Sequence, residues 1–132
     1  MFNMDFNSNI KAYSQTNLRA CQLKQLAILE EIDKICKRHQ IEYWLDGGSL
    51  LGAVRHGGFI PWDDDIDIGM TLEDEKRFEA IAPKELPEWL FLQTPKTDPG
   101  SKEPITKIRD VNSLYIENGD DFGHSYVKGI FV

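Results

Sequence analysis

Three aspartates at alternating positions are the side chains in this sequence best suited to chemistry. Asp63, Asp65 and Asp67 are each separated by one residue in the segment WDDDIDIGM. Successive side chains of a strand point to opposite faces, so a strand here would gather these three carboxylates on one face. Ile66 and Ile68 would then point to the other face, toward a core. The spacing therefore predicts an acidic cluster at the surface of a sheet.

A divalent metal ion is the expected partner of this cluster. Neighbouring carboxylates raise one another's pKa values and cost stability unless a cation neutralises them. Hard oxygen ligands favour Mg²⁺ or Mn²⁺ over zinc. A solvated acidic face or a helix cap is the alternative, and the apolar alternation argues against it. An EF-hand loop is a second alternative, but its sixth position needs Gly and holds Ile68, and its twelfth needs Glu and holds Asp74.

A glycine-serine turn lies upstream of the acidic segment. Gly47, Gly48 and Ser49 follow a predicted strand and open a short predicted helix. Glycines let a backbone approach a phosphate closely, and the amides at a helix N-terminus favour negative charge. Such a turn is more often a plain connector. Its position before an acidic strand favours a phosphate site, because phosphoryl transfer needs both a phosphate cradle and a metal.

The segment LDGGSLLGAVRHGGFIPWDDDIDI resembles the LicD family, which includes relatives of fukutin. The order of Gly48-Ser49, a short helix and the acidic strand is similar to the nucleotidyltransferase fold. The resemblance implies an enzyme that transfers phosphocholine, or in relatives a phosphoalditol, from a CDP-linked donor. The acceptor it implies is a sugar hydroxyl of a lipopolysaccharide or teichoic acid precursor.

The same resemblance implies roles for individual residues. Asp65 and Asp67 would hold one or two Mg²⁺ ions, with Asp63 as a third ligand or as a base near the acceptor hydroxyl. The glycine-serine turn would cradle the donor pyrophosphate, and CMP would leave. Arg55 becomes a further ligand of the donor phosphates.

Two basic residues are weaker candidates for the same phosphates. Lys107 and Arg109 are two positions apart on a predicted strand and would point the same way, which suits a phosphate contact. The alternative is a solvated pair of charges that protects an edge strand from aggregation.

Two rival functions stay open on the sequence. One is a nucleotidyltransferase that transfers the nucleotide itself and releases pyrophosphate. The other is a non-catalytic module that binds only metal or nucleotide. In the family the strand corresponding to KGIFV continues with an aspartate, whereas this chain stops at Val132. We therefore expect an amino-terminal portion, truncated at its carboxy-terminal end, that lacks one carboxylate arm and loses activity.

The elements that must position these residues predict an α/β or α+β fold, with a small mixed sheet and helices mainly on one side. Residues 1–14 are expected to be a loosely ordered lead-in and residues 15–132 one catalytic domain. The expected elements are a helix over 14–39, strands over 41–46 and 65–70, a short helix from 49, a helix over 71–82, a strand over 89–93, a hairpin of 105–111 with 114–117, and a strand over 127–132.

Composition narrows the partners. A formal net charge of -7 disfavours binding to nucleic acid. No apolar run is long enough to span a membrane, and the start of the chain lacks a secretory signal. We expect a cytoplasmic protein, either free or peripheral at the inner face of the membrane. Cys21 and Cys36 lie about 22 Å apart along one predicted helix and are expected to be core residues rather than a disulfide.

Overall fold

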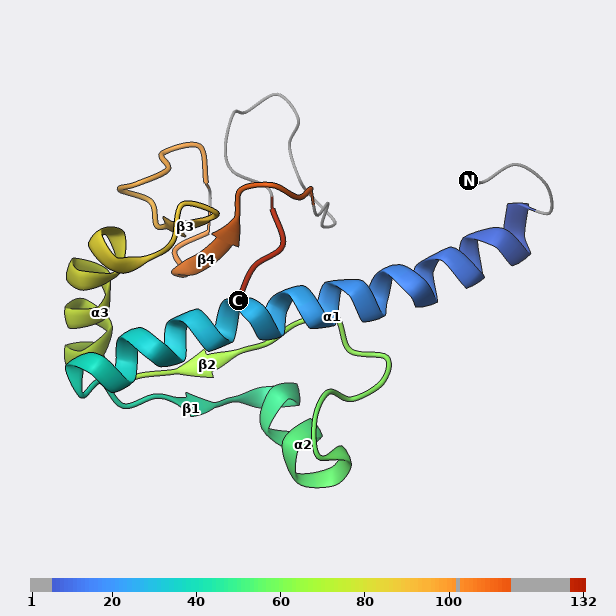
Figure 1. Cartoon of the computed structure of the whole chain (residues 1–132), viewed down its shortest axis with the longest axis horizontal. Helices are drawn as coiled ribbons and strands as arrows, with labels where there is room; N and C mark the ends of the chain where they lie inside the picture. The colour runs from blue at the N-terminus through green and yellow to red at the C-terminus, as the bar shows by residue number, and fades with distance from the viewer. Residues whose placement is uncertain (1–5, 102, 115–128) are drawn as a thin grey trace.

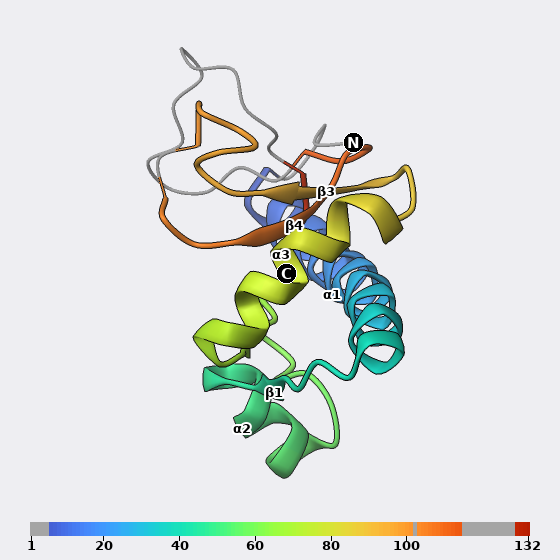
Figure 2. The same ribbon diagram turned by 90° about the vertical axis from the view of Figure 1, so that its left-hand side faces the viewer.

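The structure is a computed structural model that describes residues 6–101, 103–114 and 129–132. Figures 1 and 2 show the β1–β2 pair on one side of the long helix α1 and the β3–β4 pair on the other. The elements, in order, are α1 (Phe6–His39), β1 (Trp44–Leu45), α2 (Gly47–His56), β2 (Ile68–Gly69), α3 (Leu72–Glu85), β3 (Leu90–Gln93) and β4 (Lys107–Asp110).

Helix α1 begins at Phe6, before the expected start near Ser14. Residues 6–13 contain neither Pro nor Gly, so nothing in the sequence stops the helix there. The apolar stripe that suggested the later start marks only the part that packs on the core. Ile28 and Ile32 are fully buried, and both cysteines are buried and free, as expected.

The β1–β2 pair is antiparallel, with Trp44 opposite Gly69 and Leu45 opposite Ile68. A Cβ atom at Gly69 would lie 2.4 Å from the indole nitrogen of Trp44, so the indole packs directly on this glycine and a side chain here would displace it. Both strands are shorter than expected, and only two residues of each predicted strand pair with the other strand. The chain between β1 and β2 contains α2 and the acidic segment, and the pairing of the two strands holds the ends of this connection together.

Strand β4 lies between β3 and residues 130–132. It pairs antiparallel with β3, and on its other edge the N–H groups of Ile108 and Asp110 donate to the carbonyls of Val132 and Ile130 at 2.9 and 2.7 Å. The prediction that residues 105–111 pair with residues 114–117 in a hairpin is therefore wrong for β4. Both edges of β4 are occupied over its length, and residues 115–117 lie outside the described residues. The expected turn at Asn112 suggested that the strand pairs with the residues that follow it. The buried β4 instead pairs with segments farther away in the sequence.

Helix α3 begins as predicted. The side chain of Thr71 accepts from the N–H of Asp74 at 3.2 Å, and the helix continues through Pro83 to Glu85. Its buried face, Phe78 and Ala82, joins the core formed by α1, β3 and β4. The α/β class is confirmed, although the strands form two small antiparallel sheets rather than one mixed sheet. Within the described residues, none of the helices is both long enough and apolar enough to cross a bilayer.

Candidate metal site

A turn just before the acidic segment decides which carboxylates meet. The N–H of Asp63 donates to the carbonyl of Ile60 at 2.9 Å, and the N–H of Asp64 donates to the carboxylate of Asp63 at 2.9 Å. Carboxylate oxygens of Asp63, Asp64 and Asp65 lie within 4.8 Å of one another. Asp64 was not among the expected ligands. It joins the group because the backbone turns here instead of extending as a strand.

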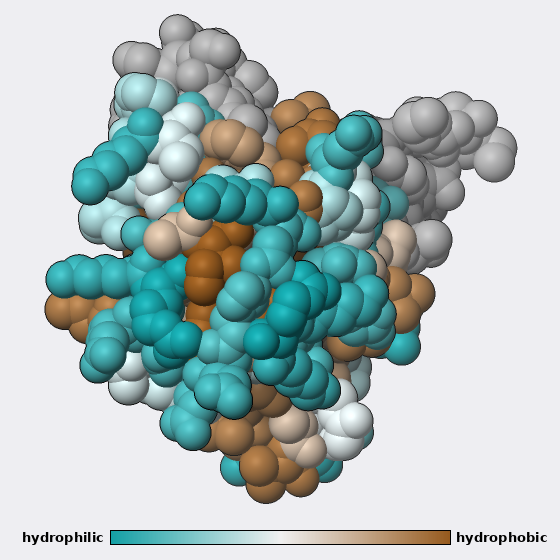
Figure 3. All heavy atoms as spheres, turned by 60° about the vertical axis from the view of Figure 1, so that its left-hand side comes forward, coloured by the Kyte–Doolittle hydropathy of each residue, from teal (hydrophilic) through white to brown (hydrophobic). Residues whose placement is uncertain are grey.

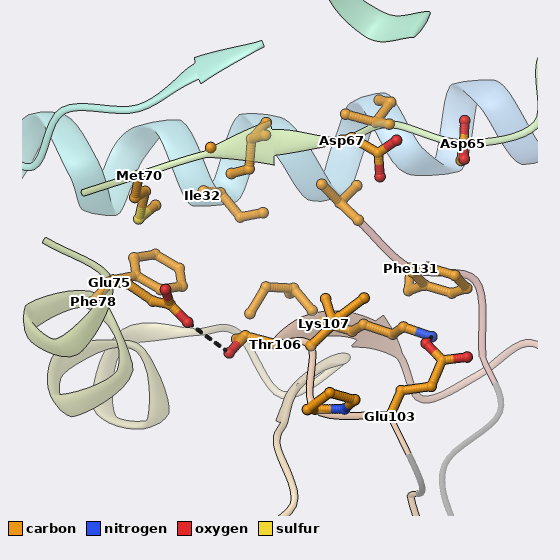
Figure 4. Close-up of a pocket in the computed structure, with 17 residues that line it drawn as sticks. Ile32, Asp65, Asp67, Met70, Glu75, Phe78, Glu103, Thr106, Lys107 and Phe131 are labelled. Atoms are coloured by element: carbon orange, nitrogen blue, oxygen red, sulfur yellow. Dashed lines mark hydrogen bonds and ion pairs between the residues drawn. The ribbon is translucent and has the colours of Figure 1, made fainter. Parts of the chain in front are cut away.

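The expected alternation holds from Asp65 onward. Ile66 is 6% exposed, whereas Asp65 is half-buried and Asp67 is exposed. Both aspartates line a cavity of about 530 Å³, to which Ile66 and Ile68 also contribute. Figure 4 shows these two aspartates on the same stretch of chain, above the residues that form the opposite wall. Two of the three aspartates predicted to share a face, Asp65 and Asp67, thus line the cavity, whereas Asp63 is not among its lining residues.

Burial and mutual repulsion shift the protonation of this segment. The pKa of Asp65 is raised to about 7, first by partial burial, then by a hydrogen bond to Asp63 and by the charges of Asp67, Asp63 and Asp64. The pKa of Asp67 is raised as well, by partial burial and by the charges of Asp63 and Asp46. These are the conditions under which a bound cation is most favourable.

The N-terminus of α2 is fastened to the acidic segment. The Ser49 hydroxyl accepts from the N–H of Asp67 at 2.9 Å, and the carbonyl of Asp67 accepts from the N–H of Asp46 at 2.9 Å. Asp46, rather than Ser49, occupies the N-cap position. The glycine-serine turn therefore lies directly against the acidic segment, and its role as a phosphate site stays a prediction.

The backbone conformation or the close surroundings explain why each of the two positions in this turn holds glycine. Gly47 has a φ of 51°, in the left-handed region that favours glycine. A Cβ atom at Gly48 would lie 2.5 Å from an Asp63 carboxylate oxygen. The absence of a side chain at Gly48 lets the Asp63 carboxylate approach the first turn of α2.

Two glutamines of α1 hold the acidic segment from behind, and sequence reasoning missed both. Gln22 donates to the carbonyl of Asp63 at 2.8 Å, and Gln25 donates to the carbonyls of Asp64 and Phe131 at 2.9 and 3.2 Å. Both side chains are 2% exposed. Their signal in the sequence was the interruption of an otherwise apolar helix stripe by two uncharged polar residues.

Lys107 lies across the cavity from the aspartates. Its ammonium group pairs with Glu103 at 2.8 Å and lies 4.3 Å from the ring centre of Phe131 (Figure 4). Lys107 is only 6% exposed, so the alternative of a solvated edge is wrong for this residue. Its position is compatible with the predicted phosphate contact.

Arg109 is buried behind Lys107. Its guanidinium donates to Gln93 at 2.8 Å and to the carbonyl of Gly129 at 2.7 Å, and stacks 4.4 Å from the ring centre of Phe131. Arg109 is not among the residues that line the cavity. It fixes the ring against which Lys107 rests.

Arg55 lies apart from this arrangement, in the exposed last turn of α2. It too is absent from the cavity lining. The apolar residues of α2, Leu50, Leu51 and Val54, are exposed, and Figure 3 shows a hydrophobic patch at the bottom of the molecule, where α2 lies.

The donor set suits a hard divalent cation. Four carboxylates are available over residues 63–67, and their oxygen atoms are the ligands that Mg²⁺ and Mn²⁺ prefer. Both cysteines are buried in the helix α1, and neither belongs to this group. The residues therefore fit Mg²⁺ or Mn²⁺ and offer no sulfur ligand for zinc.

Comparison with known proteins identifies related sequences for this region. The family model of the LicD/FKTN/FKRP nucleotidyltransferase domain matches residues 40–109. That stretch contains the glycine-serine turn, the acidic segment and Lys107. No solved structure gives a significant match.

Curated relatives share this region at substantial identity. The chain is 46% identical over 77 residues, 58% of its length, to "Lipopolysaccharide cholinephosphotransferase LicD" of Haemophilus influenzae, covering 29% of that protein. It is 58% identical over 41 residues, 31% of its length, to "Ribitol 5-phosphate transferase FKRP" of Homo sapiens, covering 8% of it. An uncharacterized protein of Rickettsia typhi is 41% identical over 78 residues, 59% of this chain and 25% of that protein. The matches thus span less than a third of these relatives.

Proposed function

The chain belongs to the LicD/FKTN/FKRP family of nucleotidyltransferase domains, and from this we propose that it transfers a phosphorylated head group such as phosphocholine from a CDP-activated donor to a hydroxyl of a cell-surface glycan precursor. The observation that carries the proposal is the cavity in which Asp65 and Asp67 face Lys107. The relatives named as a cholinephosphotransferase and a ribitol 5-phosphate transferase support a reaction that moves a phosphorylated group.

In this proposal the acceptor oxygen forms a bond to the phosphorus that bears the head group. The bond from that phosphorus to the bridging oxygen breaks, and CMP leaves with the electron pair. Asp65 and Asp67 would hold one or two Mg²⁺ ions, and a bound ion would supply positive charge that offsets the negative charge of the reacting phosphates. Asp63, whose carboxylate lies at the first turn of α2, would be either a third metal ligand or the base that accepts the proton of the acceptor hydroxyl.

Basic and backbone groups bind the donor phosphates. Gly47 and Gly48 leave the first amides of α2 accessible, and Ser49 keeps its hydroxyl hydrogen to donate while it accepts from Asp67. Lys107 adds a charge from the opposite wall. Arg109 acts indirectly by holding Phe131 in place. Arg55 is eight residues beyond Gly47, about 12 Å along the helix axis, so we assign it to a more distant part of the donor or acceptor.

Product analysis tests this function. The protein is incubated with CDP-choline, Mg²⁺ and candidate glycan acceptors, and CMP and pyrophosphate are measured. Release of CMP with labelled acceptor is expected. Asp65→Asn and Asp67→Asn should each lower the rate about a hundredfold or more, because a misplaced metal forfeits transition-state stabilisation. Glu73→Gln, an exposed acid on α3 outside the cavity, is the control and should retain wild-type rate.

Three outcomes contradict the proposal or its mechanism. Pyrophosphate release from CTP, without transfer from CDP-choline, would identify the rival nucleotidyltransferase reaction. Binding of Mg²⁺ and CMP without turnover on any donor would identify a binding module. Wild-type turnover in Asp65→Asn and Asp67→Asn would remove the acidic segment from the mechanism.

A further inference from the structure

The cavity has a second end that the transfer chemistry does not use. Figure 4 shows Glu75 and Phe78 side by side on α3, with Met70, just after β2, on the facing wall. The acidic residues 65–67 and Lys107 lie toward the opposite end. We call the group formed by Glu75, Phe78 and Met70 the α3 end.

Glu75 is a carboxylate without a cation in the part of the chain that the structure describes. The Thr106 hydroxyl donates to Glu79 at 2.5 Å and only at 3.4 Å to Glu75. Among the described residues no Lys, Arg or His forms an ion pair with Glu75. The one lysine that lines the cavity, Lys107, is paired with Glu103. The α3 end therefore offers uncompensated negative charge.

The surroundings of this carboxylate are apolar. An aromatic ring and a thioether flank it, and Ile32, Ile68 and Ile105 contribute to the same cavity wall. A carboxylate within apolar walls suits a quaternary ammonium group, which carries a positive charge, presents methyl groups and cannot donate N–H hydrogen bonds. In a partly desolvated cavity the carboxylate attracts such a cation more strongly than it would in water.

We propose that the α3 end binds a quaternary ammonium head group of the donor, with Glu75 supplying the charge and Phe78 and Met70 the apolar contact. This inference rests on the proposed function, because it assumes a donor phosphate at the acidic end. Met70 is three residues beyond Asp67, about 10 Å along an extended chain. That span accommodates a metal ion, a phosphoryl group and a short head group in line.

Two other occupants fit this end less well. A polyol head group brings several hydroxyls, and each buried hydroxyl needs a hydrogen-bond partner that an isoleucine wall cannot provide. A nucleobase would need an open ring face for stacking, but Phe78 is only 4% exposed. A trimethylammonium group needs no hydrogen-bond partner, so apolar contact and the nearby carboxylate charge are sufficient for it.

A carbon isostere of choline isolates the charge of the head group. Affinities for CDP-choline, for CDP-3,3-dimethylbutanol, in which carbon replaces the nitrogen, for CDP-ribitol and for CMP are measured by calorimetry with Mg²⁺. Wild type should prefer CDP-choline over the neutral isostere by about tenfold. Glu75→Gln should abolish this preference and leave CMP affinity unchanged. Glu79→Gln, one turn further along α3 and outside the cavity lining, should keep the preference.

The preference is a ratio of two affinities within one variant, so a fraction of unfolded protein cancels from it. The inference is overturned if wild type shows no preference or binds none of these ligands, if Glu75→Gln keeps the preference, if Glu75→Gln weakens CMP as much as CDP-choline, or if CDP-ribitol binds more tightly than CDP-choline. Preference without CMP release contradicts the proposed function alone. CMP release without preference contradicts this inference alone.

Discussion

At the scale of single residues, Asp65 combines a proposed metal-binding role with an electrostatic cost. In the folded chain its carboxyl keeps a proton up to about pH 7, whereas its ordinary pKa is 3.8. As the pH rises between these values, the unfolded state ionises first, so the folded state loses stability relative to it. The loss is complete above pH 7. A bound cation would reverse this cost.

Asp65→Asn should therefore stabilise the metal-free protein at high pH. One unit of pKa shift corresponds to about 1.4 kcal/mol, and solvent screening reduces the effect at this partly exposed site. We expect a gain on the order of 1 kcal/mol at pH 8 and almost none at pH 4, measured by urea unfolding in EDTA. A variant that is equally stable to wild type at pH 8, or less stable, would show that repulsion at Asp65 is not significant.

Gly48→Ala tests the contact between the glycine-serine turn and the acidic segment. The new Cβ would lie 2.5 Å from an Asp63 carboxylate oxygen, so the carboxylate must move. We expect Mg²⁺ affinity to fall about tenfold, because a metal ligand is displaced. Gly58→Ala is the control, since a Cβ there meets no atom within 4 Å. Equal affinities in a Mg²⁺ titration of both variants would mean that Asp63 is not a ligand.

The sequence predicted some of these residues and not others for a physical reason. Asp65 and Asp67 could be predicted because strand alternation is a local property that the neighbouring Ile66 and Ile68 reveal. Asp64 could not, because its approach to Asp63 depends on a turn that the local pattern does not specify. The carboxylates that follow a regular backbone were thus foreseeable.

At the scale of elements, α1 acts on the site through hydrogen bonds to backbone rather than through its own chemistry. The side-chain amide of Gln25 donates to the carbonyls of both Asp64 and Phe131. The ring of Phe131 in turn lies against the ammonium group of Lys107. One buried amide therefore links the two walls of the cavity. Sequence analysis assigned α1 to the core and missed this link, since the partners of Gln25 are 39 and 106 residues away.

Gln25→Met keeps the length of the side chain and removes the donor. The carbonyls of Asp64 and Phe131 then lose a hydrogen-bond donor, which should cost about 1–3 kcal/mol in unfolding free energy. Because the acidic segment is no longer fixed, Mg²⁺ affinity and CMP release should fall by more than this destabilisation explains. Gln22→Met, which releases only the Asp63 side of the segment, should weaken Mg²⁺ affinity but leave the Lys107 wall in place. Lower stability with unchanged Mg²⁺ affinity would leave Gln25 a purely structural residue.

At the scale of the whole molecule, β4 organises the larger sheet by pairing on both edges. Helix periodicity and the Thr71 cap predicted α3 correctly because both signals are local. The hairpin prediction failed because strand pairing is set by burial across the whole chain. All four residues of β4 are buried, which requires partners on either side, and those lie at β3 and at residues 130–132.

Gly129→Ala should break the closure of this sheet. A Cβ atom at Gly129 would lie 1.5 Å from the carbonyl oxygen of Asp110, a distance that no side-chain motion can relieve. We expect a loss of about 4 kcal/mol or more, the range of a severe backbone clash, in chemical unfolding. Gly58→Ala again serves as the neutral control. A small effect at Gly129 would show that residues 129–132 are not needed for the fold.

The two ends of the cavity belong to separate elements, and this separation bears on how such proteins diversify. The acidic end, which the proposed function assigns to the phosphoryl group, is formed largely by the chain between β1 and β2, whereas the other end is formed largely by α3. Substitutions on α3 could therefore change which donor is accepted while the reaction centre stays intact. Among homologues, positions 75 and 78 should vary with the donor, and positions 65 and 67 should stay fixed across donors. Selection would then act on specificity and on catalysis as two largely independent traits.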